Sequence, residues 1–176
     1  LPNCRIEFDL GDDLLNMLVR TRGDLGEALV GKRVAEQVHF NSRRGIDFLL
    51  INNARLTDEG FRQLANQKDM KRLWLINSKI TNASMSLLRG MPVLEELVLK
   101  QAKIDDLGLG QIASLTKLTF LSLQETEVTD AGIKYLRQMK ALESLSLNNT
   151  AVTDAGMAQL QHLSHLETLA LNSTQI

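Results

Sequence analysis

Two histidines and a row of acidic residues are the side chains whose types and spacing could bind a metal. His162 and His165 stand three residues apart, so a helix would place two imidazoles on one face, as in part of a zinc site. No third ligand recurs near them in the sequence, and we expect a solvated pair. The acidic row, which invites comparison with calcium sites, consists of Asp58, Asp106, Asp130 and Asp154.

Helix starts explain the acidic row better than calcium does. Calcium-binding β-rolls use much shorter repeats that are dense in glycine and aspartate. Here, one carboxylate per repeat stands just ahead of a helical pattern, where it favours the positive end of the helix. We therefore predict no calcium or zinc requirement and no cofactor.

Groupings of side chains that would indicate an enzyme are also missing from the sequence. Paired carboxylates such as Glu95 and Glu96 are adjacent in the chain, so they do not form a preset acid–base pair. No GxSxG, HExxH, P-loop or paired CxxC motif is present. We predict that the protein is not an enzyme, and the distant alternative is a hydrolase or transferase with a concave site assembled from scattered residues.

The composition narrows the classes of partner. A net charge of −1 provides no basic field that would gather nucleic acid or an acidic membrane, and no apolar run approaches the roughly 18 residues of a membrane span. Cys4 is the only cysteine, which excludes an internal disulfide and leaves the redox compartment open. With 44% hydrophobic but only 4% aromatic residues, we expect a folded chain with an aliphatic core.

A repeat of 24 residues organises the chain from residue 46 onward. Each repeat contains a leucine-rich phrase of the form LxxLxL or a close variant of it. These phrases keep register without an insertion and begin at Ile46, Met70, Leu94, Leu118, Leu142 and Leu166. Such periodicity predicts stacked structural units that share one continuous core.

Each repeat predicts a short strand, a turn and a helix. The alternating LxL phrase is typical of a strand with one buried face, and apolar residues at helical spacing follow, such as Ile133, Leu136 and Met139. Between them stand residues suited to cap a helix: Thr57, Thr81, Asp105, Thr129 and Thr153. Small residues open the helices where we expect close approach of a neighbouring coil: Gly60, Ser84, Gly108, Gly132 and Gly156.

The pattern LxxLxLxxTxVTDAGxxxLxxL resembles the leucine-rich repeat family, in its ribonuclease-inhibitor-like group. It is most similar to the regular 24-residue repeats with a TDAG helix start that are found in many bacterial proteins. The resemblance covers residues 46–176, as five full coils and a partial sixth, and implies a right-handed α/β solenoid with a parallel sheet on the concave face and helices on the convex face. Row two departs most, because Asn82-Ala83-Ser84 replaces Asp-Ala-Gly.

The first 45 residues do not repeat, and we expect them to form a helical cap over the first coil. Alternation over Cys4–Leu10 suggests a strand. Helical patterns cover Asp13–Arg20 and Leu25–His39, the second with Asp24 and Glu27 spaced as a capping box.

Side chains that flank the buried leucines should project from the concave face and form columns across the strands. Rows one to three present large apolar groups there, whereas rows five and six present short polar ones. Exposed apolar patches mark binding sites, and Trp and Arg are favoured at their centres. The predicted partner-binding residues are Phe48, Leu50, Arg72, Trp74, Ile76, Val98, Lys100 and Phe120.

Two observations leave alternatives open on this face. The amino-terminal cap could fold across the same strands and bury the patch. A column of like charges, Arg55, Lys79 and Lys103, would be explained by an acidic partner or by simple solubility.

The leading hypothesis is a recognition module that binds a protein or peptide on the concave face. The alternative is a structural or assembly segment of a larger multidomain protein, or self-association through an open C-terminal end. The sixth row stops at Ile176, so Leu166, Leu169 and Leu171 would have a coil on one side only. Because open ends invite association, we expect the natural protein to continue past this point and the isolated chain to form a homodimer.

Overall fold

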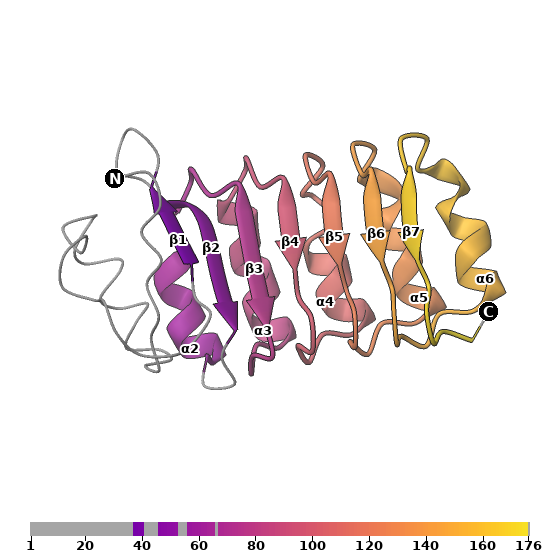
Figure 1. Cartoon of the computed structure of the whole chain (residues 1–176), viewed down its shortest axis with the longest axis horizontal. Coiled ribbons are helices and arrows are strands. Elements are labelled where there is room, and N and C mark those ends of the chain that lie inside the picture. Colours follow the sequence, from indigo (N-terminus) through magenta and orange to yellow (C-terminus); the bar gives the residue numbers. More distant parts are fainter. Residues whose placement is uncertain (1–36, 41–45, 53–55, 66, 176) are drawn as a thin grey trace.

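The computed structural model describes residues 37–40, 46–52, 56–65 and 67–175. These residues form a row of stacked coils (Figure 1), in which each coil adds one strand to a sheet and one short helix to a layer behind it. The described helices all lie on one face of the sheet. The opposite face is here called the open face.

The strands follow one another across the sheet in the order of the sequence. Six of them are parallel, and neighbouring strands pair residues 24 positions apart, such as Leu97 with Leu121 and Leu121 with Leu145. The parallel strands are β2 (Ile46–Asn52), β3 (Arg72–Ile76), β4 (Glu96–Val98), β5 (Phe120–Ser122), β6 (Ser144–Ser146) and β7 (Thr168–Ala170). The predicted α/β solenoid with leucine-rich strands is confirmed.

Each described helix starts as a short α-helix, and all but one continue as a 3₁₀-helix. The pairs are α2 (Asp58–Phe61) with η2 (Arg62–Leu64), α3 (Asn82–Met85) with η3 (Ser86–Gly90), α5 (Asp130–Ile133) with η4 (Lys134–Gln138), and α6 (Asp154–Met157) with η5 (Ala158–His162). The exception, α4 (Asp106–Gln111), is α-helical throughout. Because a 3₁₀-helix rises about 2.0 Å per residue against about 1.5 Å for an α-helix, the switch carries the chain back to the next strand with fewer residues.

The predicted N-caps are confirmed in all five described helices. Each cap has an extended backbone, and its side-chain oxygen accepts a hydrogen bond from a backbone N–H in the first turn, which satisfies a group that the helix itself leaves unpaired. The caps are Thr57, Thr81, Asp105, Thr129 and Thr153.

The core lies between the sheet and the helices and is built mainly from leucines, isoleucines, valines and methionines, with Phe61 as its aromatic member. The two leucines of each LxL phrase are fully buried in β5 and β6 and their following turns, at Leu121, Leu123, Leu145 and Leu147. The turn after them also points inward. Thr126 and Thr150 are buried, and their hydroxyls donate to the carbonyl oxygens of Leu123 and Leu147, at 2.6 and 2.7 Å.

One residue per coil adopts a left-handed backbone just beyond the strand. These residues have φ between 51° and 61° and recur every 24 positions, at Asn77, Gln101, Glu125, Asn149 and Ser173. Asparagine tolerates this region well and the other types less well, so the turn is imposed by the stacking of coils rather than chosen by residue type.

The amino-terminal segment differs from its expected form where the structure describes it. The helix expected over Leu25–His39 is wrong at its end, because strand β1 (Gln37–Phe40) pairs antiparallel with β2. An unpaired edge of β2 would expose a row of backbone donors and acceptors, and the pairing satisfies them. The other elements expected in residues 1–36 lie outside the described residues. No helix in the described part of the chain is long and apolar enough to cross a membrane.

Candidate functional site

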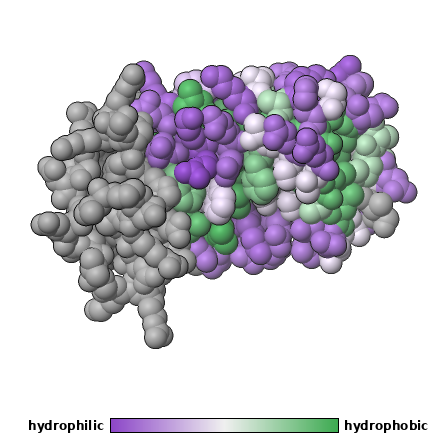
Figure 2. Space-filling model, turned by 45° about the horizontal axis from the view of Figure 1, so that its top comes forward, coloured by the Kyte–Doolittle hydropathy of each residue, from purple (hydrophilic) through white to green (hydrophobic). Residues whose placement is uncertain are grey.

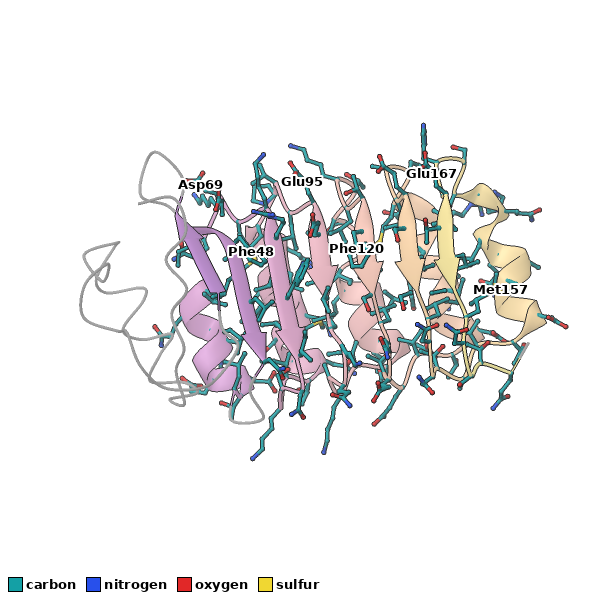
Figure 3. All side chains as sticks on the ribbon, viewed as in Figure 1. Phe48, Asp69, Glu95, Phe120, Met157 and Glu167 are labelled. Carbon is teal, nitrogen blue, oxygen red and sulfur yellow. The ribbon has the colours of Figure 1, made fainter. Side chains whose placement is uncertain are left out.

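The open face is a grid in which side chains from successive strands stand in line. The register places one row along the beginning of the strands, as Phe48-Arg72-Glu96-Phe120-Ser144-Thr168. A second row follows two residues later, as Leu50-Trp74-Val98-Ser122-Ser146-Ala170. Figure 3 shows Phe48 and Phe120 on this side of the molecule, on β2 and β5. Residues that were predicted to share a column of the concave face therefore do lie next to one another across the strands.

An ordered aromatic cluster occupies the grid over β2–β4. The rings of Phe48 and Trp74 meet edge to face, with 5.5 Å between their centres and 82° between their planes. The guanidinium carbon of Arg72 lies 4.6 Å above the centre of the Phe48 ring, which is within the range of a cation–π contact. The indole N–H of Trp74 donates to Oε2 of Glu96 at 3.1 Å. Each member of the cluster is thus held by its neighbour.

The predicted site residues divide into a buried base and a partly exposed surface. Phe48 is only 4% exposed and Val98 8%, so these two predicted residues offer little surface to a partner. The others are half-buried and form its accessible part: Leu50, Arg72, Trp74, Ile76, Lys100 and Phe120. Sequence reasoning missed Glu96, whose carboxylate orients the tryptophan.

Lys100 belongs to a separate polar cluster. Its Nζ lies 3.4 Å from Oε1 of Glu125, and Glu125 also accepts hydrogen bonds from Gln101 and Gln124, at 2.6 and 3.1 Å. The hydrogen bond from Gln101 and the nearby Lys100 lower the pKa of Glu125 despite partial desolvation. Glu125 was not predicted as a site residue, although it stands one repeat after Gln101. Lys100 is therefore already neutralised within the chain.

Three other cations of the second and third coils have no such neutralisation among the described residues. Arg72, Lys79 and Lys103 form no ion pair among the residues that the structure describes, whereas Lys71 pairs with Glu95 at 3.3 Å. Lys79 and Lys103 stand one coil apart, as predicted, next to Thr57 and Thr81 of the preceding coils. Arg55, the remaining member of the predicted basic column, lies outside the described residues. Of the three, only Arg72 stands in a row of the open face, whereas Lys79 and Lys103 lie beyond the strands, beside helix caps.

Strands β5–β7 carry a different surface. After Phe120, the side chains in the two rows are small or polar: Ser122, Ser144, Ser146, Thr168 and Ala170. In the turns, Asn148 accepts a hydrogen bond from the backbone N–H of Asn172 at 2.7 Å. Beyond Phe120 at the start of β5, the described residues of these two rows therefore offer hydrogen-bonding groups but no further aromatic side chain and no cation.

The aspartate row forms a ladder between coils, which sequence reasoning missed. Oδ1 of Asp106 accepts the backbone N–H of Thr129 at 2.8 Å, and Oδ2 accepts the Thr129 hydroxyl at 2.7 Å. Asp130 repeats both bonds to Thr153 at the same distances. The threonine caps its own helix with the same hydroxyl. Each Thr-Asp pair therefore caps one helix and fastens it to the next coil.

The glycine of the TDAG phrase leaves room for this ladder. A Cβ atom at Gly132 would lie 2.3 Å from Oδ1 of Asp106, and one at Gly156 would lie 2.3 Å from Oδ1 of Asp130. These distances are far below van der Waals contact. In the second coil, Ser84 takes the place of glycine and instead donates its hydroxyl to Asp58. The predicted close approach is confirmed at Gly132 and Gly156, where the approaching group is a carboxylate, and at Gly108, where it is the amide of Asn82.

The second coil departs from the repeat at Asn82, and the third coil compensates for this departure. Asn82 replaces the usual aspartate, and Asp105 replaces the usual threonine. Nδ2 of Asn82 donates to Oδ1 of Asp105 at 2.6 Å, and the backbone N–H of Asp105 donates to Oδ1 of Asn82 at 3.2 Å. An aspartate has no hydroxyl to donate, so its neighbour must be an amide. The two changes together preserve the ladder.

Hydrogen bonds of the ladder lower the pKa of Asp58, Asp105 and Asp130. The backbone N–H of Thr153, followed by its hydroxyl, lowers the pKa of Asp130. Burial alone would raise the pKa of Asp58 and Asp105. For Asp58 the hydrogen bonds from Ser84 and Thr81 outweigh burial, and for Asp105 those from Asn82 and the helix N–H groups do so.

The two histidines that could have bound metal lie on the surface. His162 and His165 are exposed, and Nδ1 of His165 is 2.9 Å from the carbonyl oxygen of Lys140. Within the described ranges, no group of three or more His, Cys, Asp or Glu side chains is placed to hold a metal ion. The absence of a metal requirement stays a prediction.

The last coil is less well covered than the others. Leu166, Leu169 and Leu171 are half-buried, whereas the equivalent leucines one coil earlier are fully buried. Figure 2 shows a band of hydrophobic surface near this end of the molecule. Among the described strands, β7 is paired on one side only.

Comparisons with known proteins agree with this architecture. A family model described as "Leucine Rich repeat" matches residues 114–136. A search of curated proteins by sequence finds no match. Among solved structures, the leucine-rich-repeat ectodomain of the receptor kinase SOBIR1 from Arabidopsis thaliana is similar, with a TM-score of 0.55 and 19% identity over 96% of this chain and 95% of that one.

Two further structures share the fold. Internalin C2 from Listeria monocytogenes has a TM-score of 0.52 and 20% identity over 93% of this chain and 84% of that chain. The actin-binding site 2 of leiomodin-1 has a TM-score of 0.53 and 19% identity over 68% of this chain and 79% of its own. At these identities, the likeness concerns the fold.

Proposed function

We propose that this leucine-rich-repeat solenoid is a non-enzymatic recognition module that binds a protein or peptide on the open face of its sheet, over strands β2–β4. The aromatic cluster carries the proposal: Trp74 and Arg72 stand half-buried on a fixed base, and Leu50 and Ile76 widen the apolar surface beside them. Side chains that are already ordered lose little conformational entropy on binding. Trp and Arg are also the residue types that most often dominate binding energy.

Selection from a display library of random 12-residue peptides, followed by affinity measurement on variants, tests this function. We expect the selected peptides to lose at least about tenfold in affinity on Trp74→Ala, since hot-spot truncations cost about 2 kcal/mol or more. Tyr135→Ala is the matched control, because Tyr135 is also a half-buried aromatic residue but lies in the helix layer, against Gly110. Equal losses in both variants, or loss only with Tyr135→Ala, would contradict binding on the open face.

As the alternative, we propose that the chain by itself associates through its last coil, whose leucines are half-buried. Covering a few hundred Å² of apolar surface at about 25 cal/mol per Å² would be worth several kcal/mol, which is enough for a homodimer at high concentration. Light scattering across a concentration series should show the mass rising toward twice that of the chain. A constant monomer mass would remove this candidate.

We assign the repeats to the ribonuclease-inhibitor-like group, of the bacterial type with 24-residue TDAG repeats. Two features support this assignment: the unbroken 24-residue register and the use of Thr, Asp and Gly together in the ladder between coils. We also propose that residues 1–45 cap the repeats of residues 46–176, with β1 as the part of the cap that joins the sheet.

A further inference from the structure

Arg72 is placed to receive an anion from a bound partner. Its guanidinium carbon is held over Phe48, and Phe48 is held in turn by the edge of Trp74. The carboxylate nearest along the row, on Glu96, accepts the indole N–H of Trp74. In the described part of the chain, no acidic group forms an ion pair with Arg72. An arginine that is ordered and forms no ion pair among the described residues can offer its N–H donors to a ligand.

The charge of Arg72 points to an acidic ligand. Lys79 and Lys103 lie farther away, beyond the ends of β3 and β4 and beside the helix caps Thr57 and Thr81, without ion pairs among the described residues. The nearer cation Lys100 is paired with Glu125. A guanidinium matches the geometry of a carboxylate and can bind both of its oxygens. Nucleic acid is a poorer match, because the net charge of the chain is −1.

The surface next to Arg72 is apolar and narrow. Leu50 and Trp74 are paired across β2 and β3, and Ile76 follows on β3. Strands are spaced about 4.8 Å apart and an extended peptide rises about 3.3 Å per residue. A segment of about four residues therefore crosses the three strands, with one side chain at Arg72 and another on the apolar surface.

We propose that the partner is an acidic peptide segment in extended form, which places an Asp or Glu carboxylate on Arg72 and a neighbouring apolar side chain against Trp74 and Ile76. This inference rests on the proposed function and specifies its partner. Lys79 and Lys103 contribute a longer-range attraction that salt weakens, while Arg72 supplies the directional contact.

The test uses a display library of 12-residue peptides in which Asp, Glu, Lys and Arg are encoded at equal frequency. Selected peptides should be enriched in acidic over basic residues. Their synthetic forms should change the fluorescence of Trp74, which is the only tryptophan in the chain. Arg72→Gln should lower the affinity of the selected peptides about tenfold or more, as the loss of a charge-assisted pair does. Arg137→Gln, which removes the same charge from the exposed surface of η4, should leave affinity unchanged.

The outcomes separate this inference from the function on which it rests. Peptides without acidic enrichment that depend on Trp74 but not on Arg72 would overturn the acidic partner and leave recognition intact. Peptides whose affinity depends on neither Trp74 nor Arg72 would overturn both the acidic partner and recognition on this face. A 12-nucleotide oligothymidylate that competes with the peptides and depends equally on Arg72 would also overturn a peptide partner. If acrylamide fails to quench Trp74 in the folded chain, the face is covered by the chain itself, and the inference is wrong.

Discussion

Strands β2–β4 and β5–β7 turn equivalent leucine-type residues toward the helices but present different side chains on the open face. Leu97 and Leu145 are both fully buried, yet Trp74 and Ser146 occupy the same row on the other side. Stacking demands identical spacing and shape only on the core side, because each coil must fit its neighbour there. The open face is free of that demand, so its departures from the repeat are the best guide to function.

Truncating a buried leucine should lower the stability by a similar amount in both halves, and this loss is the largest effect that we expect. Leu97→Ala and Leu145→Ala should each lower the free energy of unfolding by about 3 kcal/mol, because each leaves a cavity in a fully buried layer. Urea denaturation measures both. A cost in one half several times smaller than in the other would show that the two halves do not share one continuous core.

The junction of the second and third coils provides the next test. Asn82→Asp should cost about 2 kcal/mol, since it sets two carboxylates against each other where an amide now donates to Asp105. Adding Asp105→Thr recreates the regular pair seen between Asp106 and Thr129, so the double variant should recover most of the loss.

Asp105→Thr alone is the control for this cycle and should be nearly neutral, because a threonine hydroxyl can donate to the oxygen of Asn82. If the double variant is as unstable as Asn82→Asp, the two departures from the repeat are independent, and the compensation inferred from the structure is wrong.

The core was predictable from the sequence because its period is rigid. The leucines at 121 and 145, the caps at Thr129 and Thr153, and the alignment of Phe48 with Arg72 all follow from a register of 24 residues and the alternation of a strand. The ladder was not predictable. An aspartate after a cap satisfies the helix dipole equally well, and only the stacked backbone shows that Asp106 reaches the next coil.

The candidate site was predictable as a list of neighbours but not as an arrangement. Nothing in the spacing indicates that Phe48 is buried beneath Arg72, that Glu96 binds the indole of Trp74, or that Glu125 neutralises Lys100. These contacts depend on side-chain rotamers, which the repeat does not specify. The strand β1 was missed because pairing with the edge of β2 overrides a helical pattern in sequence.

A smaller effect should distinguish two substitutions at the glycine of the ladder. Gly132→Ala places a methyl group against the carboxylate of Asp106 and should cost about 1 kcal/mol, net of the better helix propensity of alanine. Gly132→Ser should cost less, because a hydroxyl can donate to that carboxylate as Ser84 does to Asp58. Thermal unfolding compares the two, and a serine variant clearly less stable than the alanine variant would contradict this role.

The smallest expected effect is a dependence of stability on pH in the acid range. The folded chain lowers the pKa of Asp130, so its contribution is complete above the unfolded pKa of about 3.9 and is lost as the pH falls through the folded pKa. The urea concentration at the midpoint of unfolding should therefore decrease as the pH is lowered below about 4. Asp130→Asn should give a flatter profile, and an unchanged slope in that variant would contradict the assignment.

The central claim is that the face over β2–β4, and not that over β5–β7, receives the partner. Amide chemical-shift mapping of the isotope-labelled chain with a selected peptide tests it most directly. The claim predicts that the amide chemical shifts of Phe48–Leu50, Arg72–Ile76 and Glu96–Val98 change on binding. The shifts of Ser144–Ser146 and Thr168–Ala170 should stay the same. Changes confined to β5–β7 or to the helix layer would contradict it.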